Sequence, residues 1–294
     1  DRSDADGLLL IIQVICSSIR HSRCPHAKIV AILLLICFGR CSDDDVILQR
    51  ILPFIMIMLE DQVSSVKATA IRACRSLIRM VTKFSAIQSN LFQFYVFPAL
   101  GEISKDTDAM VRVAFAESIG HFAEISKEFL DKQQMLHVKK LTREEINKDT
   151  SSVLGQELYS FFSNKNEADR YNGSYTMFVE SSYDVRYKSL QDQVSRWIRD
   201  LMLASGNVDS RKGSGLASHN SIIKRALLTD IVRLCVFFGQ ESTMDLLIPQ
   251  LLTFLNDQDW ELRYAFCAKI TSVCLFVGPI VTSGLLMQLL RGSD

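Results

Sequence analysis

The sequence has little glycine and proline, no excess of either charge, and no apolar run long enough to cross a bilayer. Its 13 glycines and 5 prolines among 294 residues suit a helical protein better than a loop-rich one. Lysine plus arginine and aspartate plus glutamate both number 33, so the basic excess of a typical nucleic-acid-binding protein is missing. The longest apolar stretches, residues 8–15 and 29–38, fall short of the ~20 residues that a spanning helix needs. We therefore expect neither nucleic-acid binding nor membrane insertion.

Signatures of catalysis are missing as well. There is no HExxH, GxSxG, glycine-rich phosphate loop or kinase catalytic motif, and the five histidines are scattered. We predict that the chain is not an enzyme and has no catalytic, cofactor-binding or metal-binding residues. The first residue is not Met, and the repeat pattern described below breaks off at the end. We therefore expect a piece of a longer protein.

The eight cysteines contain no CxxC pair. Cys37 and Cys41 are spaced as neighbours on a helix, and His21 and His26 flank Cys24, so a metal site is conceivable. Most of the cysteines lie in apolar helical runs. We favour buried free thiols in a reducing compartment over a metal site.

The clearest unit of the sequence covers residues 91–130. Its first half is apolar with Pro98 inside the run, and a short polar joint follows. Its second half spaces large apolar residues at the steps of an amphipathic helix. They are Val111, Phe115, Ile119, Phe122 and Phe129. Asp108 or Thr107 can cap the first turn of this helix. The unit is therefore predicted to be two helices joined by a tight turn.

The same pattern occurs three times. Each copy has a Pro, then seven residues, an Asp, four residues, an aliphatic residue, a basic residue and, soon after, an Ala. The copies are Pro53, Asp61, Val66, Lys67 and Ala70; Pro98, Asp106, Val111, Arg112 and Ala114; and Pro249, Asp257, Leu262, Arg263 and Ala265. Pro53 and Pro98 lie 45 residues apart, within the ~40–47-residue period of HEAT and armadillo repeats. The pattern predicts an all-α, HEAT/armadillo-like solenoid of stacked antiparallel helix pairs.

Each recurring position of this pattern has a structural explanation. The Pro kinks the first helix because it lacks a backbone donor. The Asp lies in the turn, where its carboxylate can accept free N–H groups of the second helix. The basic residue can reach the turn Asp of its own or a neighbouring repeat. We therefore interpret Asp61, Asp106 and Asp257 as structural.

The pattern divides the chain into three parts. We expect N-terminal HEAT repeats over 1–130, an irregular helical insert over 131–181, and C-terminal HEAT repeats over 182–294 with a disordered loop at about 205–220. Capping boxes predict helix starts at Thr142 and at Ser181.

Later parts of the chain return to the repeat pattern or gather aromatic residues. After the loop we expect a second-type helix over 222–239, a complete repeat over 244–277 and one more first helix over 283–290. Residues 159–187 contain five of the seven tyrosines. Packing onto the solenoid is favoured there over a partner surface.

Several stretches together resemble a known family. They are residues 224–228 (KRALL), 233–239 (RLCVFFG), 254–257 (FLND), 260–263 (WELR), 48–59 (LQRILPFIMIML) and 111–117 (VRVAFAE). Ordinary HEAT proteins share the Pro, Asp and Arg pattern but not the LCVFFG run. The chain resembles the central HEAT-repeat region of the vacuolar-protein-sorting regulatory, kinase-like subunits of the class III phosphatidylinositol 3-kinase complex. Residues 131–220 match least.

The resemblance implies a non-catalytic scaffold. It would position a kinase-like domain, a WD-repeat propeller and the lipid kinase subunit for phosphatidylinositol 3-phosphate production in autophagy and endosomal sorting. The implied partners are the catalytic subunit and beclin-type subunits. The implied location is the cytoplasm, peripheral on endosomal and autophagic membranes as part of the complex. The alternative is a generic HEAT adaptor, such as a phosphatase scaffold or a transport receptor, which a long insert fits poorly.

Overall fold

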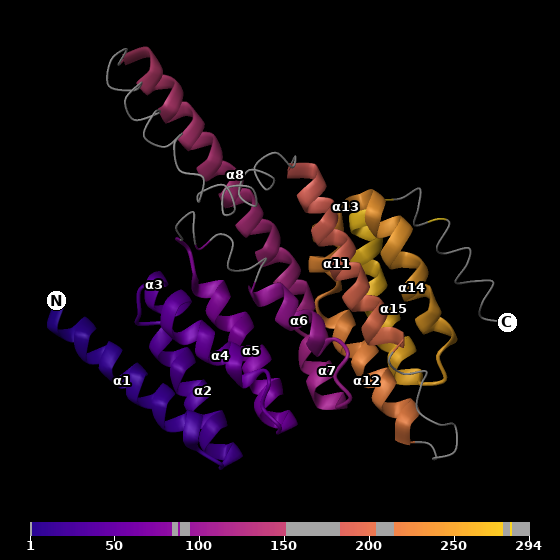
Figure 1. The fold of residues 1–294 in the computed structure, drawn as a ribbon. Coiled ribbons are helices and arrows are strands. Elements are labelled where there is room, and N and C mark those ends of the chain that lie inside the picture. The colour runs from indigo at the N-terminus through magenta and orange to yellow at the C-terminus, as the bar shows by residue number, and fades with distance from the viewer. Residues whose placement is uncertain are drawn as a thin grey trace, which may run out of the picture.

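The computed structural model describes residues 2–83, 88, 95–150, 183–203, 215–278 and 283. Every regular element within these ranges is a helix, so the predicted all-α class is confirmed. Figure 1 shows the helices side by side in one stack, coloured along it from indigo at the N-terminus to yellow at the C-terminus. The chain forms a helical solenoid of antiparallel helix pairs.

Each pair has a first and a second helix, and the two kinds form two rows. The first row contains α1 (Arg2–His21), α3 (Asp44–Val46), η1 (Ile47–Ile51), α4 (Leu52–Met58), α6 (Phe97–Ile103), α11 (Tyr183–Leu203), η4 (Thr243–Leu247), α14 (Ile248–Leu252) and η5 (Thr253–Asn256). The second row contains α2 (Pro25–Gly39), α5 (Ser64–Met80), α7 (Ala109–Ala116), α12 (Gly215–Thr229) and α15 (Trp260–Val277). After short breaks, α8 (Ile119–Thr150) continues α7, and α13 (Ile231–Ser242) continues α12.

The second helices contact one another in sequence order. The contacts run from α2 to α5, α7, α12 and α15, and a parallel set joins α8 to α13 and α13 to α15. The contact between α7 and α12 spans the stretch that the sequence marks as an insert. The row of second helices is therefore continuous from one end of the stack to the other, while the far half of α8 projects beyond it (Figure 1).

A π-helical turn precedes the Pro of each repeat. Pro53 is the second residue of α4 directly after η1, and Pro249 has the same place after η4. The two residues before Phe97, and so just ahead of Pro98, are also π-helical. A Pro ring crowds the carbonyl four residues before it, and the wider π turn relieves that crowding. The predicted kink therefore takes the form of a π turn.

The second helices of the third and fourth pairs are each broken. Two residues separate α7 from α8, and Asp230 separates α12 from α13. We expected a continuous helix in both places, so this part of the prediction is wrong, although the apolar stripe from Val111 to Phe129 is buried as predicted. The two breaks face each other. A Cβ on Gly120 would lie 3.0 Å from the Cβ of Asp230, so the glycine permits a close approach of α8 to this turn.

Gly239 marks a second irregularity in the fourth pair. Its φ of 76° and ψ of 172° interrupt α13, and an L-residue rarely adopts this conformation. This geometry explains the glycine at the end of the RLCVFFG run. Downstream of it, the Thr243 hydroxyl donates a hydrogen bond of 3.2 Å to the carbonyl of Cys235, which closes the bend.

Two predicted boundaries after Leu130 are wrong. The capping box at Thr142 starts no helix, because α8 continues through it to Thr150. The predicted loop at about 205–220 overlaps α12, which already begins at Gly215. By contrast, α11 begins at Tyr183, close to the second capping box, and α15 covers 260–277 as expected. The other calls on 151–182, 204–214 and 284–290 lie outside the described residues.

Trp197 of α11 locks the third pair to the fourth. Its ring centroid lies 4.6 Å from that of Phe97 and 5.5 Å, edge-on, from that of Phe115. All three rings are buried. Burial of such rings stabilises a core by several kcal/mol. The aromatic cluster of Phe97, Phe115 and Trp197 therefore anchors α11 against α6 and α7.

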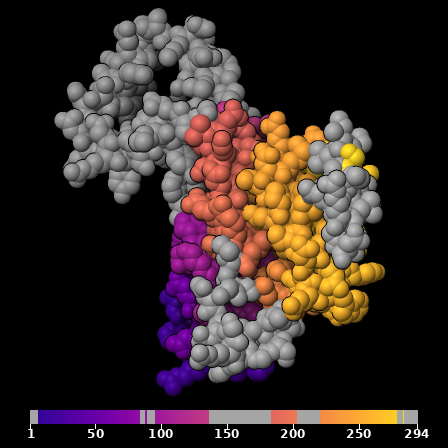
Figure 2. All heavy atoms as spheres, turned by 90° about the vertical axis from the view of Figure 1, so that its right-hand side faces the viewer, coloured from indigo at the N-terminus to yellow at the C-terminus, as the bar shows by residue number. Residues whose placement is uncertain are grey.

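The far end of the stack carries exposed apolar side chains. Figure 2 turns this end toward the viewer, with α11 in salmon beside α13, α14 and α15 in orange and yellow. On α15, Trp260, Tyr264 and Leu275 are 65%, 71% and 83% exposed. No helix of the described part of the chain is both long and apolar enough to span a membrane.

Candidate functional site

Lysine–aspartate pairs connect successive helix pairs. Each lysine lies on the second helix of one pair, and each aspartate lies in the turn of the next pair. The Nζ–Oδ2 distances are 2.5 Å for Lys28–Asp61, 2.7 Å for Lys67–Asp106 and 2.6 Å for Lys224–Asp257. We call these three pairs the ionic ladder. The prediction that the basic residue reaches a neighbouring turn Asp is confirmed for Lys67.

The ladder aspartates also fix their own turns. The second carboxylate oxygen of each accepts a hydrogen bond from the backbone N–H two residues later, at 2.9 Å from Val63 to Asp61 and 3.1 Å from Asp259 to Asp257. Burial would raise the pKa of Asp61, but the hydrogen bonds from Lys28 and from Val63 outweigh it and lower the pKa. The pKa of Asp257 is lowered in the same way. Both side chains are therefore ionised at neutral pH.

Two of the second helices are capped by aspartates that lie two residues after ladder aspartates. Asp108, two residues after Asp106, accepts the Met110 N–H at 2.8 Å and caps α7. Asp259 caps α15 in the same way, through the N–H of Glu261 at 2.9 Å. The alternative of Asp108 or Thr107 as the cap is thus settled in favour of Asp108. A hydrogen bond from the Ser64 side chain is the largest contribution to its lowered pKa.

The arginines at the basic position do not extend the ladder. Arg112 is buried and donates a 3.0 Å hydrogen bond from Nη2 to the carbonyl of Leu201, at the end of α11. Arg263 donates to the carbonyls of Asp257 and Gln258 in its own turn. The prediction that the basic residue contacts a turn carboxylate is therefore wrong for both arginines. Their role is to satisfy carbonyls at the ends of helices and turns.

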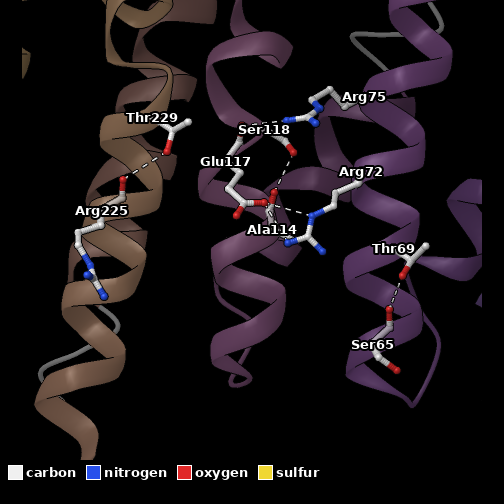
Figure 3. Close-up of polar contacts among 9 residues, drawn as sticks. All are labelled: Ser65, Thr69, Arg72, Arg75, Ala114, Glu117, Ser118, Arg225 and Thr229. Carbon is white, nitrogen blue, oxygen red and sulfur yellow. Dashed lines mark hydrogen bonds and ion pairs between the residues drawn. The ribbon is translucent and has the colours of Figure 1, made fainter. Parts of the chain in front are cut away.

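A second row of polar contacts lies along the second helices (Figure 3). Arg72 of α5 donates from Nη2 and Nε to Oε2 of Glu117, at 2.9 and 3.1 Å, and Arg75 donates to the Glu117 carbonyl at 3.2 Å. Ion pairs at other junctions are Arg225–Glu261 and Arg233–Glu124. The sequence reasoning missed this row. A signal existed, because Arg72 and Glu117 are 45 residues apart, which is the spacing between the first two repeat prolines.

His121 lies at the meeting point of the two helix breaks. Its Nδ1 is 2.6 Å from Oδ2 of Asp230, although the two atoms are not aligned for a hydrogen bond. Burial lowers the pKa of His121, the Asp230 carboxylate opposes this, and the nearby Arg233, Arg75 and Arg79 lower it further. The imidazole is therefore neutral at physiological pH, and the contact is sensitive to protonation.

The cysteines differ from the expectation of burial. Cys74 and Cys235 are buried, and burial raises the pKa of the Cys74 thiol to about 12 and that of Cys235 to about 11. The thiols at positions 24, 37, 41 and 267 are exposed, so the prediction is wrong for these. Among the described residues, no three His, Cys, Asp or Glu side chains gather as a metal-binding group.

Two tyrosines of the aromatic-rich stretch lie within the described residues. The hydroxyl of Tyr183 donates to Oδ1 of Asp131 at 2.5 Å, and that of Tyr187 donates to the carbonyl of Phe237. The Tyr187 ring lies edge-on to the Phe237 ring, with the centroids 5.7 Å apart. These two tyrosines pack between α8, α11 and α13, as the favoured interpretation predicted.

Comparison with known proteins places the chain in a family. The model of the "PIK3R4-like, middle domain" family matches residues 11–293, which is nearly the whole length. The chain belongs to the PIK3R4-like middle-domain family. This result confirms the resemblance seen in the sequence. The match begins within α1 and runs past the end of α15, so it includes residues of every helix pair.

Relatives of this PIK3R4-like middle domain are much longer proteins. The chain is 31% identical over 276 residues to "Probable serine/threonine-protein kinase vps15" of Dictyostelium discoideum, covering 93% of the chain and 12% of that protein. It is 30% identical over 265 residues to "Serine/threonine-protein kinase VPS15" of Arabidopsis thaliana, covering 90% and 16%. For the Saccharomyces cerevisiae protein of the same name the values are 24% over 248 residues, 83% and 14%. The chain thus spans less than a fifth of these relatives.

Proposed function

We propose that the chain is a non-catalytic HEAT-repeat scaffold of the regulatory subunit of the class III phosphatidylinositol 3-kinase complex. Its task is geometric. It holds the kinase-like domain and the WD-repeat propeller of the whole protein at a set separation and contacts the lipid kinase subunit. The complex would act peripherally on endosomal and autophagic membranes, with beclin-type subunits among its partners.

The observation that carries this proposal is the continuous row of second helices in a chain of this family. Helical repeats that bury a shared core transmit position along their length. The ionic ladder and the aromatic cluster connect neighbouring pairs and oppose sliding between them. The polar side chains described above serve helix ends, turns and junctions. These side chains bind helix ends, turns or neighbouring helices, and they are not arranged as a nucleophile beside its general base.

The proposal is tested by capture on the class III lipid kinase catalytic subunit. The purified chain, shown to be helical by circular dichroism, is passed over the immobilised subunit, and an unrelated HEAT array of similar length is the control. We expect retention of the chain well above the control. Charge reversal along the Arg72–Glu117 row and along the first-helix side then identifies the binding face.

Retention equal to the control, from a folded chain, would contradict direct contact with the lipid kinase. A further experiment then separates the remaining possibilities. The whole protein with this region replaced by an unrelated solenoid of equal length is assayed for phosphatidylinositol 3-phosphate production. Full activity would show that spacing alone suffices, and loss of activity would point to a contact with another subunit.

A further inference from the structure

A groove of about 610 Å³ lies at the N-terminal end of the stack, between α1 and the η1–α4 segment. Its floor is apolar and includes Ile12, Phe54 and Ile57, the last of which is 41% exposed. Ser17 and Arg20 of α1 and Arg50 of η1 also line it. The volume is that of a site which accepts several side chains of a ligand.

The charge around this groove has one sign. Among the described residues that line it, Arg20 and Arg50 are the fully charged ones, and none carries a carboxylate. The thiol of Cys16 also lines the groove, and burial raises its pKa, so it adds no negative charge. Elsewhere along the stack, two of the arginines between helix pairs form ion pairs with acids: Arg72 with Glu117 and Arg233 with Glu124. No ion pair of Arg20 or Arg50 is found in the described part of the chain.

The η1–α4 segment presents a basic and an apolar side chain on the same side of the helix. Arg50 lies in η1, and Ile57 follows seven residues later on the same side of the helix. Both side chains are exposed and both line the groove. Across from them, α1 supplies Ile12 to the floor and Arg20 two turns further along. The groove therefore offers an apolar floor with a guanidinium on each wall.

We propose that this groove binds an amphipathic helix of a partner protein, with apolar side chains on the floor and carboxylates facing Arg20 and Arg50. An amphipathic helix laid in an apolar groove is a recurrent mode of peptide recognition. Guanidinium groups bind carboxylates strongly and with defined geometry. The inference concerns a different surface from the second-helix rows, and it does not depend on which complex the chain serves.

The test is a selection from an unbiased library of phage-displayed helical peptides, panned against the purified chain. Peptides are recovered from wild type and counter-selected on the double variant R20E/R50E. We expect the enriched peptides to combine apolar residues at helical spacing with Glu or Asp. Their Kd, measured by fluorescence anisotropy, should rise at least tenfold in R20E/R50E. The matched control is Arg40→Glu, at an exposed arginine outside the groove, which should change the Kd less than twofold.

Four results would overturn the inference. One is an enriched pool without an acidic bias, and another is no enrichment at all. A third is equal affinity for wild type and R20E/R50E when circular dichroism shows both folded. The fourth is self-association of wild type that R20E/R50E abolishes, because the occupant would then be a second copy of the chain. The Ile57→Lys variant tests the apolar floor separately, because it keeps both arginines. Its affinity for the enriched peptides should also fall at least tenfold.

Discussion

Between the second and third helix pairs a lysine and an aspartate form the contact, whereas between the third and fourth pairs an arginine and a tryptophan do so. At the first junction Lys67 reaches Asp106. At the second, Arg112 binds the carbonyl of Leu201, and Trp197 fills the space between the pairs. The first kind recurs at α2–α5 and α12–α15.

The kind of contact at each junction depends on how many residues of the chain separate the two helix pairs. In the ladder, the paired residues are 33 to 39 positions apart, and one compact repeat supplies the next turn. At the α7–α12 junction a long stretch of chain comes between the two pairs. There the stack depends on large apolar rings and on hydrogen bonds to helix ends, which need no repeat spacing. The solenoid therefore continues across this junction without a lysine–aspartate pair of the ladder. Aromatic packing, hydrogen bonds to helix ends and the Arg233–Glu124 ion pair take its place.

The largest expected effect is at the α7–α12 junction. Trp197→Ala should lower the free energy of unfolding by about 3–5 kcal/mol, because it removes a buried ring from between two helix pairs. Urea unfolding followed by circular dichroism measures it. Trp260→Ala is the control, since this ring is 65% exposed and should change stability by less than about 0.5 kcal/mol. Equal losses in the two variants would show that Trp197 stabilises its junction no more than an exposed ring does.

Gly239 should be the next most sensitive position. Gly239→Ala puts a Cβ where φ is 76° and should cost about 1–3 kcal/mol. Gly7→Ala in α1, where a Cβ would meet no atom within 4 Å, should be neutral or stabilising by up to about 1 kcal/mol. Thermal melts of both variants compare them. A Gly239→Ala variant as stable as wild type would mean that the bend in α13 is absent.

The Lys67–Asp106 pair of the ladder and the Arg72–Glu117 pair should differ in coupling energy. A double-mutant cycle of Lys67→Met with Asp106→Asn should show about 1–2 kcal/mol, because both side chains are mostly buried, at 24% and 14% exposure. The cycle of Arg72→Met with Glu117→Gln should show less than about 0.5 kcal/mol, since that pair is 43% and 34% exposed. The order of the two coupling energies is the test. A larger value for Arg72–Glu117 would show that this pair, and not Lys67–Asp106, contributes more to the contact between α5 and the next helix pair.

The smallest expected effect is a pH dependence at His121. Its folded-state pKa is lowered, so the unfolded chain takes up a proton first as the pH falls past about 6.5. Stability should be full above that pH and decline below it, and His121→Gln should flatten the decline between about pH 7.5 and 5.5. Unfolding free energies at several pH values measure this. An unchanged profile in His121→Gln would assign the decline to other groups.

The regular part of the stack could be predicted because the information is local. A Pro, a turn Asp and a basic residue act within one repeat or the next, so their spacing reveals the fold and the contact of Lys67 with Asp106. The course of α8 could not be predicted in the same way. The second half of α8 is polar, and it projects from the stack. The capping box at Thr142 therefore seemed to mark the start of a new helix, although α8 continues through it.

The junction residues and the groove were beyond the reach of the sequence for another reason. Whether Arg112 meets a carboxylate or the carbonyl of Leu201 depends on where α11 ends, which only packing determines. Trp197 appears in the sequence as one more apolar residue of a long helix. The groove depends on which arginines have no ion pair within the described part of the chain, and that property of Arg20 and Arg50 emerges only once α1 lies against η1.

The central claim is that α7–α8 and α12–α13 lie directly against each other across the insert. The most direct measurement is disulfide formation in a Gly120→Cys/Asp230→Cys variant, whose Cβ atoms would be about 3.0 Å apart and need only a small shift to bond. Mild oxidation followed by peptide mass mapping should show an intramolecular link between 120 and 230, and no link in a Gly7→Cys/Asp230→Cys control. A monomer in which both cysteines stay reduced, or bond only between molecules, would contradict a continuous stack.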